Sequence, residues 1–161
     1  MKIVFYTAGG TIDKIYFDAK SKYEVGKSIL GEILKEGNIT FEYESKIIMQ
    51  KDSLDLTDDD RDVIYKTIDE EENRNIVLTH GTDTMVTTAQ YLQGVKNKVV
   101  VLTGSMTPAR FRTSDAAFNI AFAISAVQTL PDGIYLAMNG RIFQPDNVRK
   151  NVEKAIFESI K

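Results

Sequence analysis

The sequence predicts an α/β domain built on a doubly wound, mostly parallel sheet. Short apolar runs rich in β-branched residues alternate along the whole chain with longer segments of helical periodicity. Glycines, hydroxyl residues and acidic residues follow these runs, where the strands would end. No repeat, low-complexity tract or linker-like segment divides the 161 residues, a length that suffices for one full core. We therefore expect a single domain over residues 1–161 and no second domain.

Five segments are expected to form the sheet, because each is apolar or alternates between apolar and polar residues. They are residues 2–7, 39–49, 76–78, 99–102 and 134–138. An Asn139-Gly140 turn follows the last strand, and residues 141–146 are expected to be irregular because Pro145 disfavours a helix there.

Helical segments separate these strands. Thr57 and Asp60 have the spacing of a capping box, which predicts a helix from there to about residue 72. Residues 114–129 are apolar nearly all round, which predicts a buried helix. Further helices are expected over residues 29–34, 84–93 and 148–160. The main apolar contribution of the second helix would come from Val63, Ile64, Tyr65 and Ile68, and the last helix would turn Val152, Ala155, Ile156 and Ile160 inward. Alternation of this kind is typical of a Rossmann-like fold.

Residues 13–22 interrupt this pattern, because they lose apolar periodicity and become polar. We interpret them as a mobile loop or a short hairpin, the type of segment that closes over a site.

The composition excludes several classes of function. The net charge is −3 and no block of Lys and Arg exceeds two residues, so a nucleic-acid or membrane-surface partner has no electrostatic support. The absence of cysteine excludes disulfides, thiol catalysis and cysteine-ligated metals. The N-terminal apolar run is too short for a signal peptide, and no stretch approaches the roughly 20 apolar residues of a membrane span. We expect a soluble cytoplasmic protein.

Two strand ends carry the strongest chemical signal. Residues 79–85, Thr-His-Gly-Thr-Asp-Thr-Met, follow one apolar run, and residues 7–13, Thr-Ala-Gly-Gly-Thr-Ile-Asp, follow another. Ligands of open parallel sheets bind outside the carboxyl ends of the strands, where helix N-termini also favour anions. Thr11 and Thr82 would therefore face one pocket. A threonine hydroxyl needs a partner to act as a nucleophile, and Tyr23, Asp83 or a lysine could be that partner.

Structural roles compete with the chemical ones. Thr11 and Ser53 could cap turns, and Thr82 with Asp83 could cap the following helix. His80 is interpreted as a structural hydrogen-bonding residue rather than an acid or base. The acidic run at 58–60 suits the first turn of a helix better than a metal site. We expect neither a metal nor a cofactor.

Six motifs occur in the order seen in bacterial-type L-asparaginases. They are residues 8–12 (Ala-Gly-Gly-Thr-Ile), 23–26 (Tyr-Glu-Val-Gly), 52–53 (Asp-Ser), 79–85, 101–108 (Val-Leu-Thr-Gly-Ser-Met-Thr-Pro) and 148–150 (Val-Arg-Lys). Over essentially its whole length, the chain resembles the amino-terminal, nucleophile-bearing domain of that family. It departs from the family at Ala8, where members usually have threonine. We also expect it to lack the smaller carboxy-terminal domain that members typically carry, since the sequence stops at Lys161.

The resemblance implies a role for each matching residue. Thr11 would attack the side-chain amide and form an acyl-enzyme, and Tyr23 would orient it. Thr82, Asp83 and Lys150 would form a second catalytic group. Substrate binding would involve Gly10, Asp52, Ser53, Gly81, Thr82 and Asp83. Within that set Ser53 would hold the α-carboxylate and Asp83 the α-ammonium, while backbone N–H groups near Gly10 and Gly81 could stabilise the oxyanion.

The activity implied is hydrolysis of L-asparagine, or alternatively L-glutamine, to the acid and ammonia in a homodimer or homotetramer. A non-catalytic module that binds aspartate, asparagine or a partner is the alternative from another class. Amide hydrolysis on a peptide or a charged tRNA is a third possibility, although the weakly acidic charge argues against tRNA.

Overall fold

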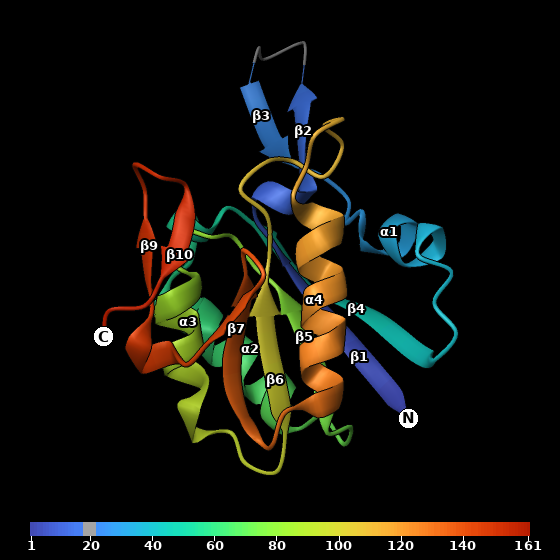
Figure 1. Ribbon diagram of the computed structural model, residues 1–161, viewed down its shortest axis with the longest axis vertical. Coiled ribbons are helices and arrows are strands. Elements are labelled where there is room, and N and C mark those ends of the chain that lie inside the picture. The colour runs from blue at the N-terminus through green and yellow to red at the C-terminus, as the bar shows by residue number, and fades with distance from the viewer. Residues whose placement is uncertain (18–21) are drawn as a thin grey trace.

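A six-stranded sheet forms the centre of the computed structural model, which describes residues 1–17 and 22–161 (Figure 1). Its strands are β1 (Lys2–Gly9), β4 (Glu42–Lys51), β5 (Asn75–Thr79), β6 (Val99–Thr103), β7 (Gly133–Met138) and β8 (Arg141–Phe143). They lie in the order β4-β1-β5-β6-β7-β8. The first five are parallel and β8 is antiparallel to β7. The predicted doubly wound, mostly parallel sheet is therefore confirmed.

Helices cover both faces of the sheet. The helices α1 (Leu30–Glu36) and α4 (Ala116–Thr129) pack on one face, where Phe5, Val77 and Val101 form the core. The helices α2 (Asp58–Asp69) and α3 (Met85–Tyr91) pack on the other, against alternate residues of the same strands. Side chains of a strand point alternately to its two faces, and both faces of the inner strands β1, β5, β6 and β7 are buried, so these strands are almost continuously apolar, unlike the edge strand β4.

The strand order places the topological switch point of the sheet between β1 and β5. The chain leaves β1 towards α1 on one face, whereas it leaves the neighbouring β5 towards α3 on the other. Adjacent parallel strands whose connections diverge in this way leave an opening at their carboxyl ends, where ligands of such folds bind. The residues that follow β1 and β5 therefore meet at this opening.

The expected helix over residues 148–160 is wrong. This segment instead forms an antiparallel hairpin of β9 (Arg149–Asn151) and β10 (Ile156–Glu158). The Asn151 side chain accepts a hydrogen bond from the N–H of Lys154, and Ala155 has a left-handed φ of 50°. Both features favour a turn over a helix. Of the residues expected to face inward, Ala155 is exposed, Ile156 is half-buried, and Val152 and Ile160 are 75% and 57% exposed; Phe157 enters the core instead.

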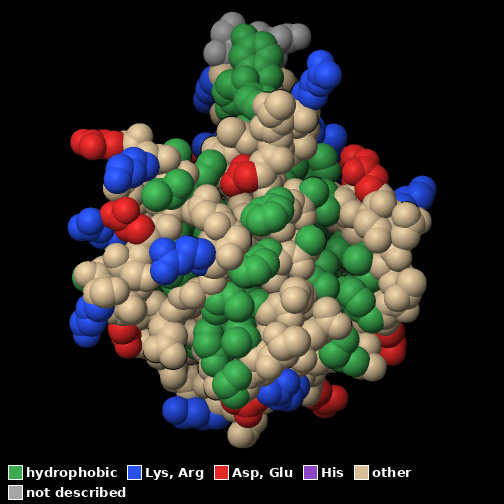
Figure 2. Space-filling view, viewed as in Figure 1, with side chains coloured by type: hydrophobic (Ala, Val, Ile, Leu, Met, Phe, Trp, Pro, Cys, Tyr) green, Lys and Arg blue, Asp and Glu red, His purple; other side chains and the backbone are tan. Residues whose placement is uncertain are grey.

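Three smaller expectations also need correction. The stretch expected to be irregular contains β8, because the turn at Asn139 and Gly140 returns the chain beside β7. Val63 lies on the outer side of α2 and is half exposed. The helix α4 is buried on one side only: Phe118 is 60% exposed, and Figure 2 shows apolar side chains along its outer face. Apolar composition alone does not reveal which side of a helix meets the sheet.

The strand β2 (Lys14–Phe17) pairs antiparallel with β3 (Lys22–Val25), which agrees with the hairpin of the two expected alternatives. Residues 18–21, which belong to the expected mobile loop, lie outside the described residues. The hairpin projects from the end of the sheet where β1 stops (Figure 1). Asp13 closes its base, because its carbonyl accepts from Gly26 N–H at 2.8 Å and its carboxylate accepts from Ile29 N–H at 3.0 Å.

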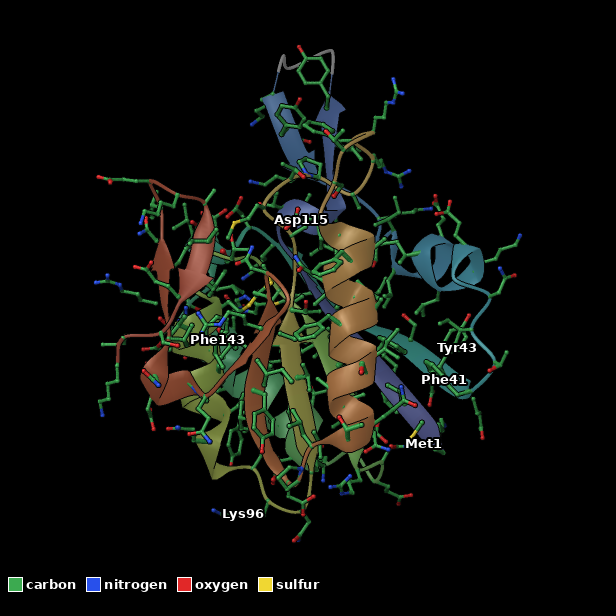
Figure 3. The ribbon with its side chains drawn as sticks, in the orientation of Figure 1. Met1, Phe41, Tyr43, Lys96, Asp115 and Phe143 are labelled. Carbon is green, nitrogen blue, oxygen red and sulfur yellow. The ribbon has the colours of Figure 1, made fainter. Side chains whose placement is uncertain are left out.

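The loop after β6 is tied to the start of α4 at this same end of the molecule. Asp115, which lies beside the hairpin end in Figure 3, accepts hydrogen bonds from the backbone N–H groups of Met106 and Thr107. Lys96 marks the opposite end. Within the described ranges, no helix is long and apolar enough to cross a membrane.

Candidate active site

The backbones that follow β1 and β5 touch each other. A Cβ atom at Gly10 would overlap the Cα and N of Gly81, and a Cβ at Gly81 would lie 2.5 Å from the Ser53 hydroxyl oxygen. Gly10 also has φ 96° and ψ −170°, a conformation that is open essentially to glycine alone. The backbones at Gly10 and Gly81 thus touch directly, the Ser53 side chain packs against Gly81, and Thr11 and Thr82 are the next residues along their two segments.

Thr82 has a charged partner from the distant end of the chain. Lys150 Nζ lies 2.8 Å from Thr82 Oγ1 and 2.6 Å from Asp83 Oδ1. The Lys150 side chain is only 17% exposed although it lies on β9. The β9–β10 hairpin fixes it there, because Phe157, paired with Lys150 in register, is anchored in the core. A lysine, a hydroxyl and a carboxylate are therefore in mutual contact.

Thr11 lies on a short turn with fixed backbone. The turn spans Thr11–Asp13, and Ile12 within it is buried and accepts a hydrogen bond from Ala109 N–H at 3.1 Å. Thr11 itself is partly exposed, and among the described residues no protein group hydrogen-bonds its hydroxyl. The backbone is thus held while the hydroxyl stays free to react or bind.

Ser53 follows β4 and also reaches the contact point. Its hydroxyl is buried and, in the described part of the chain, has no hydrogen-bond partner. A buried polar group without a partner is costly, and such groups often await a ligand. Ser53 does not cap its turn; Asp52 does, accepting from Leu54 N–H at 3.2 Å. The Thr84 hydroxyl donates to the Ser53 carbonyl at 2.8 Å and joins the two loops.

Asp52 is held by the hairpin rather than by the other site residues. Lys14 Nζ lies 2.6 Å from its carboxylate. Partial burial, the largest single influence, acts to raise the pKa of Asp52, but the hydrogen bonds from Lys14 and from Leu54 N–H, together with the nearby lysine charges, keep that pKa below its ordinary value. The ion pair connects the hairpin base to the turn that carries Ser53.

The structure does not bring the Tyr23 hydroxyl to Thr11. The Tyr23 ring is 48% exposed and lies edge-on to Tyr16 and Phe111, at centroid distances of 5.4 and 5.9 Å. Across the described residues no hydrogen bond joins it to Thr11. Tyr23 instead borders a hollow of about 670 Å³ that is also lined by Lys14 and Asp52.

The capping alternative for Thr82 and Asp83 is wrong. The first residue flanking α3 is Thr84, and no side chain caps this helix. Asp83 directs Oδ1 to Lys150 and remains about one-third exposed. The acidic run at 58–60 does belong to the first turn of α2, where Thr57 and Asp60 form the predicted capping box.

His80, directly before Gly81 in the sequence, is fully buried. Its Nδ1 lies 2.8 Å from the Gly81 carbonyl and its Nε2 lies 2.9 Å from the Thr88 hydroxyl. Burial lowers the pKa of His80 to about 4, so the ring is neutral at pH 7. The structural interpretation of His80 agrees with these contacts. Sequence reasoning gave no signal for its partner Thr88, for Arg61 beyond it, or for Lys14.

This depressed pKa makes stability depend on pH. Unfolded histidine has a pKa near 6.5, so the unfolded chain binds a proton that folded His80 refuses between pH 6.5 and 4. The stabilisation that neutral His80 contributes is therefore fully present above pH 6.5 and is lost as the pH falls towards the folded pKa of about 4. We expect the free energy of unfolding to drop by about 2.5 kcal/mol more between pH 7 and 4.5 in the native chain than in His80→Asn. Urea unfolding of both proteins at the two pH values measures this difference. An equal drop in the unfolding free energy of the native chain and of His80→Asn would contradict the prediction.

The model of the family described as "Asparaginase, N-terminal" matches residues 2–160. The chain belongs to the asparaginase family. The L-asparaginase of Thermococcus kodakarensis is 35% identical over 93% of this chain and 48% of that protein. Its solved structure superimposes with a TM-score of 0.83 at 30% identity, covering 99% of this chain and 51% of that one.

Some relatives carry names other than L-asparaginase. The glutaminase-asparaginase of Acinetobacter glutaminasificans is 29% identical over 93% of this chain and 50% of its own length. A component of the glutamyl-tRNA(Gln) amidotransferase from Methanococcus vannielii is 42% identical over 42% of this chain and 16% of its own length. This asparaginase-family chain spans about half the length of the full-coverage relatives.

Proposed function

We propose that this chain is an amidohydrolase that converts L-asparagine to L-aspartate and ammonia, with L-glutamine as an alternative substrate. The observation that carries the proposal is the close contact between the backbones of Gly10 and Gly81, the residues directly before Thr11 and Thr82. One hydroxyl is free and the other is held by Lys150. Family membership supports amide hydrolysis in general.

In the proposed reaction, Thr11 Oγ1 bonds to the side-chain amide carbon and gives up its proton. The carbon–nitrogen bond breaks, and nitrogen leaves as ammonia with that proton. Water then attacks the threonine ester, which releases L-aspartate and restores the Thr11 hydroxyl. Thr82, which hydrogen-bonds to Lys150, would relay the Thr11 proton to the leaving nitrogen in the first step and a water proton back to the Thr11 oxygen in the second.

The same residues suit a zwitterionic substrate. The unpartnered Ser53 hydroxyl can donate to the α-carboxylate, and the Asp83 carboxylate retains an oxygen for the α-ammonium after pairing with Lys150. Backbone N–H groups beside Gly10 and Gly81 are candidates to stabilise the oxyanion. Each group is fixed on a strand end or a short turn, which favours binding in one orientation.

One observation favours the non-catalytic alternative. Tyr23 packs against Tyr16 and Phe111 instead of reaching Thr11, so the nucleophile lacks the partner that the family resemblance implied. A module with this arrangement would bind aspartate or asparagine without turnover. The similarity of part of the chain to a glutamyl-tRNA(Gln) amidotransferase subunit supports the third alternative, an amide substrate larger than a free amino acid.

Ammonia release tests the proposal directly. The purified chain is incubated with L-asparagine, L-glutamine or a capped asparaginyl peptide, and ammonia is measured by a coupled assay while calorimetry measures aspartate binding. Release from asparagine supports the amidohydrolase. Saturable aspartate binding without release supports the sensor, and release from the peptide alone supports the larger substrate. A homodimer or homotetramer and a cytoplasmic location stay predictions.

A further inference from the structure

A buried hydrogen-bonded chain runs from α2 to the backbone of the site. Arg61 Nε donates to Thr88 Oγ1 at 3.3 Å, Thr88 Oγ1 lies 2.9 Å from His80 Nε2, and His80 Nδ1 lies 2.8 Å from the Gly81 carbonyl. Thr88 and His80 are fully buried and Arg61 is only 6% exposed. These residues come from α2, α3 and the loop after β5.

Chemistry fixes the direction of every bond in this chain. A carbonyl oxygen can only accept, so His80 Nδ1 carries the hydrogen and donates it to Gly81. In a neutral ring Nε2 must then accept, so the Thr88 hydroxyl donates to it. That leaves a lone pair of Thr88 Oγ1 for a donor, and a guanidinium can only donate. The hydrogen bonds therefore all run in one direction, from the Arg61 donor to the Gly81 acceptor.

The hydrogen-bonded series ends at the Gly81 carbonyl, whose orientation affects the position of the site residues. Gly81 touches Gly10 and Ser53, and Thr82 follows it directly. If the Gly81 peptide plane turned, the Thr82 hydroxyl would move relative to Lys150. We propose that Arg61 is a positioning residue that, through Thr88 and His80, locks the Gly81 peptide and so aligns Thr82 with Thr11. The catalytic part of this proposal rests on the amidohydrolase function proposed above.

The charge of Arg61 is not explained by its ion pair. Its partner Asp58 lies at the exposed end of the side chain, 3.0 Å from Nη1, and the Asp58 side chain is 83% exposed. An exposed pair of this kind contributes little stability, whereas holding a guanidinium among apolar groups is costly. The buried Nε, by contrast, supplies the donor that Thr88 needs. Burial is the main cause of the low pKa of His80, and the positive charge of Arg61 adds to it by disfavouring protonation of the ring.

The single histidine of the chain allows a direct measurement. In nitrogen-15 NMR of the intact protein we expect one histidine signal pattern, that of a neutral ring protonated at Nδ1, down to about pH 5. In Arg61→Met, which keeps the side-chain volume but removes donor and charge, the pKa of His80 is expected to rise and the Nδ1–H tautomer to lose population. An Nε2–H tautomer in the native chain, or an unchanged His80 in Arg61→Met, would overturn the proposal.

Kinetics distinguish alignment from loose packing. Arg61→Met is expected to lower kcat for asparagine roughly 10-fold to 100-fold with little change in KM, because Ser53 and Asp83 are untouched. Arg61→Lys, which restores a charged donor, should recover part of the loss. Asp58→Asn, which removes only the exposed ion pair, should behave as native. Thr88→Val breaks the chain with Arg61 in place and should lower kcat similarly, which decides the matter if Arg61→Met does not fold.

The two proposals fail in different ways. If the native chain releases no ammonia, the proposed function fails, and the histidine tautomer and pKa still decide whether Arg61 sets the hydrogen-bond polarity. If the native chain is active and Arg61→Met retains native kcat, the positioning role is wrong and the amidohydrolase assignment stands.

Discussion

Replacing Thr11 by valine is expected to reduce ammonia release by roughly 10³-fold or more without loss of the fold. Valine has nearly the same shape but no hydroxyl, so no acyl-enzyme can form. The fold should tolerate the change, because in the described part of the chain the Thr11 hydroxyl has no hydrogen bond to lose. The measurement is ammonia release by the purified variant, with urea unfolding as the test of folding.

Thr79→Val is the matched control. Thr79 ends β5, is buried, and among the described residues its hydroxyl has no hydrogen-bond partner. Removal of this orphan hydroxyl should leave turnover unchanged and stabilise the protein by up to about 1 kcal/mol. Thr82→Val should abolish turnover as Thr11→Val does, since it breaks the contact with Lys150. If Thr11→Val released ammonia at the native rate, the nucleophile would have to lie elsewhere.

The sheet was predictable because its signal is local. Strands buried on both faces must be nearly all apolar, and β5 and β6 stand out from the polar segments around them for that reason. The α2 start was predictable as well, because the capping box of Thr57 and Asp60 is a contact between residues three apart. The hairpin of β9 and β10 was not, because helix and strand patterns are ambiguous in short mixed segments. There the anchoring of Phe157 in the distant core decides the conformation.

The site was predictable only in part. Residues at strand ends converge whatever else the chain does, so Thr11, Ser53 and Thr82 could be placed on one rim from the alternation of strands and helices. Lys150 could be connected to Thr82 only by resemblance, since no local pattern links residues 68 positions apart. Arg61 and Thr88 gave no signal, because a buried arginine and an exposed one are identical in a helical pattern.

Replacing Gly10 by alanine is expected to destabilise the protein by about 3 kcal/mol or more and to abolish activity. The φ of 96° with ψ of −170° is strained for any residue with a Cβ. That Cβ would also overlap backbone atoms of Gly81, which cannot swing aside as a side chain could. Relief would require the ends of β1 and β5 to separate, which would move Thr11 from Thr82. Urea unfolding and ammonia release measure both effects.

Gly31→Ala is the control that separates the effect of the Gly10–Gly81 contact from the general effect of replacing a glycine by alanine. Gly31 lies in α1, and nothing lies within 4 Å of the place that an alanine methyl would take, so alanine there should stabilise the protein by about 0.5–1 kcal/mol. The same chemical change would thus have opposite signs at two positions in one molecule. If Gly10→Ala instead cost less than about 1 kcal/mol and left activity intact, the two strand ends would have room between them. The shared site of Thr11 and Thr82 would then lose its closest geometric support, because the pairing of β1 with β5 places the two residues at one end of the sheet without fixing how near they lie.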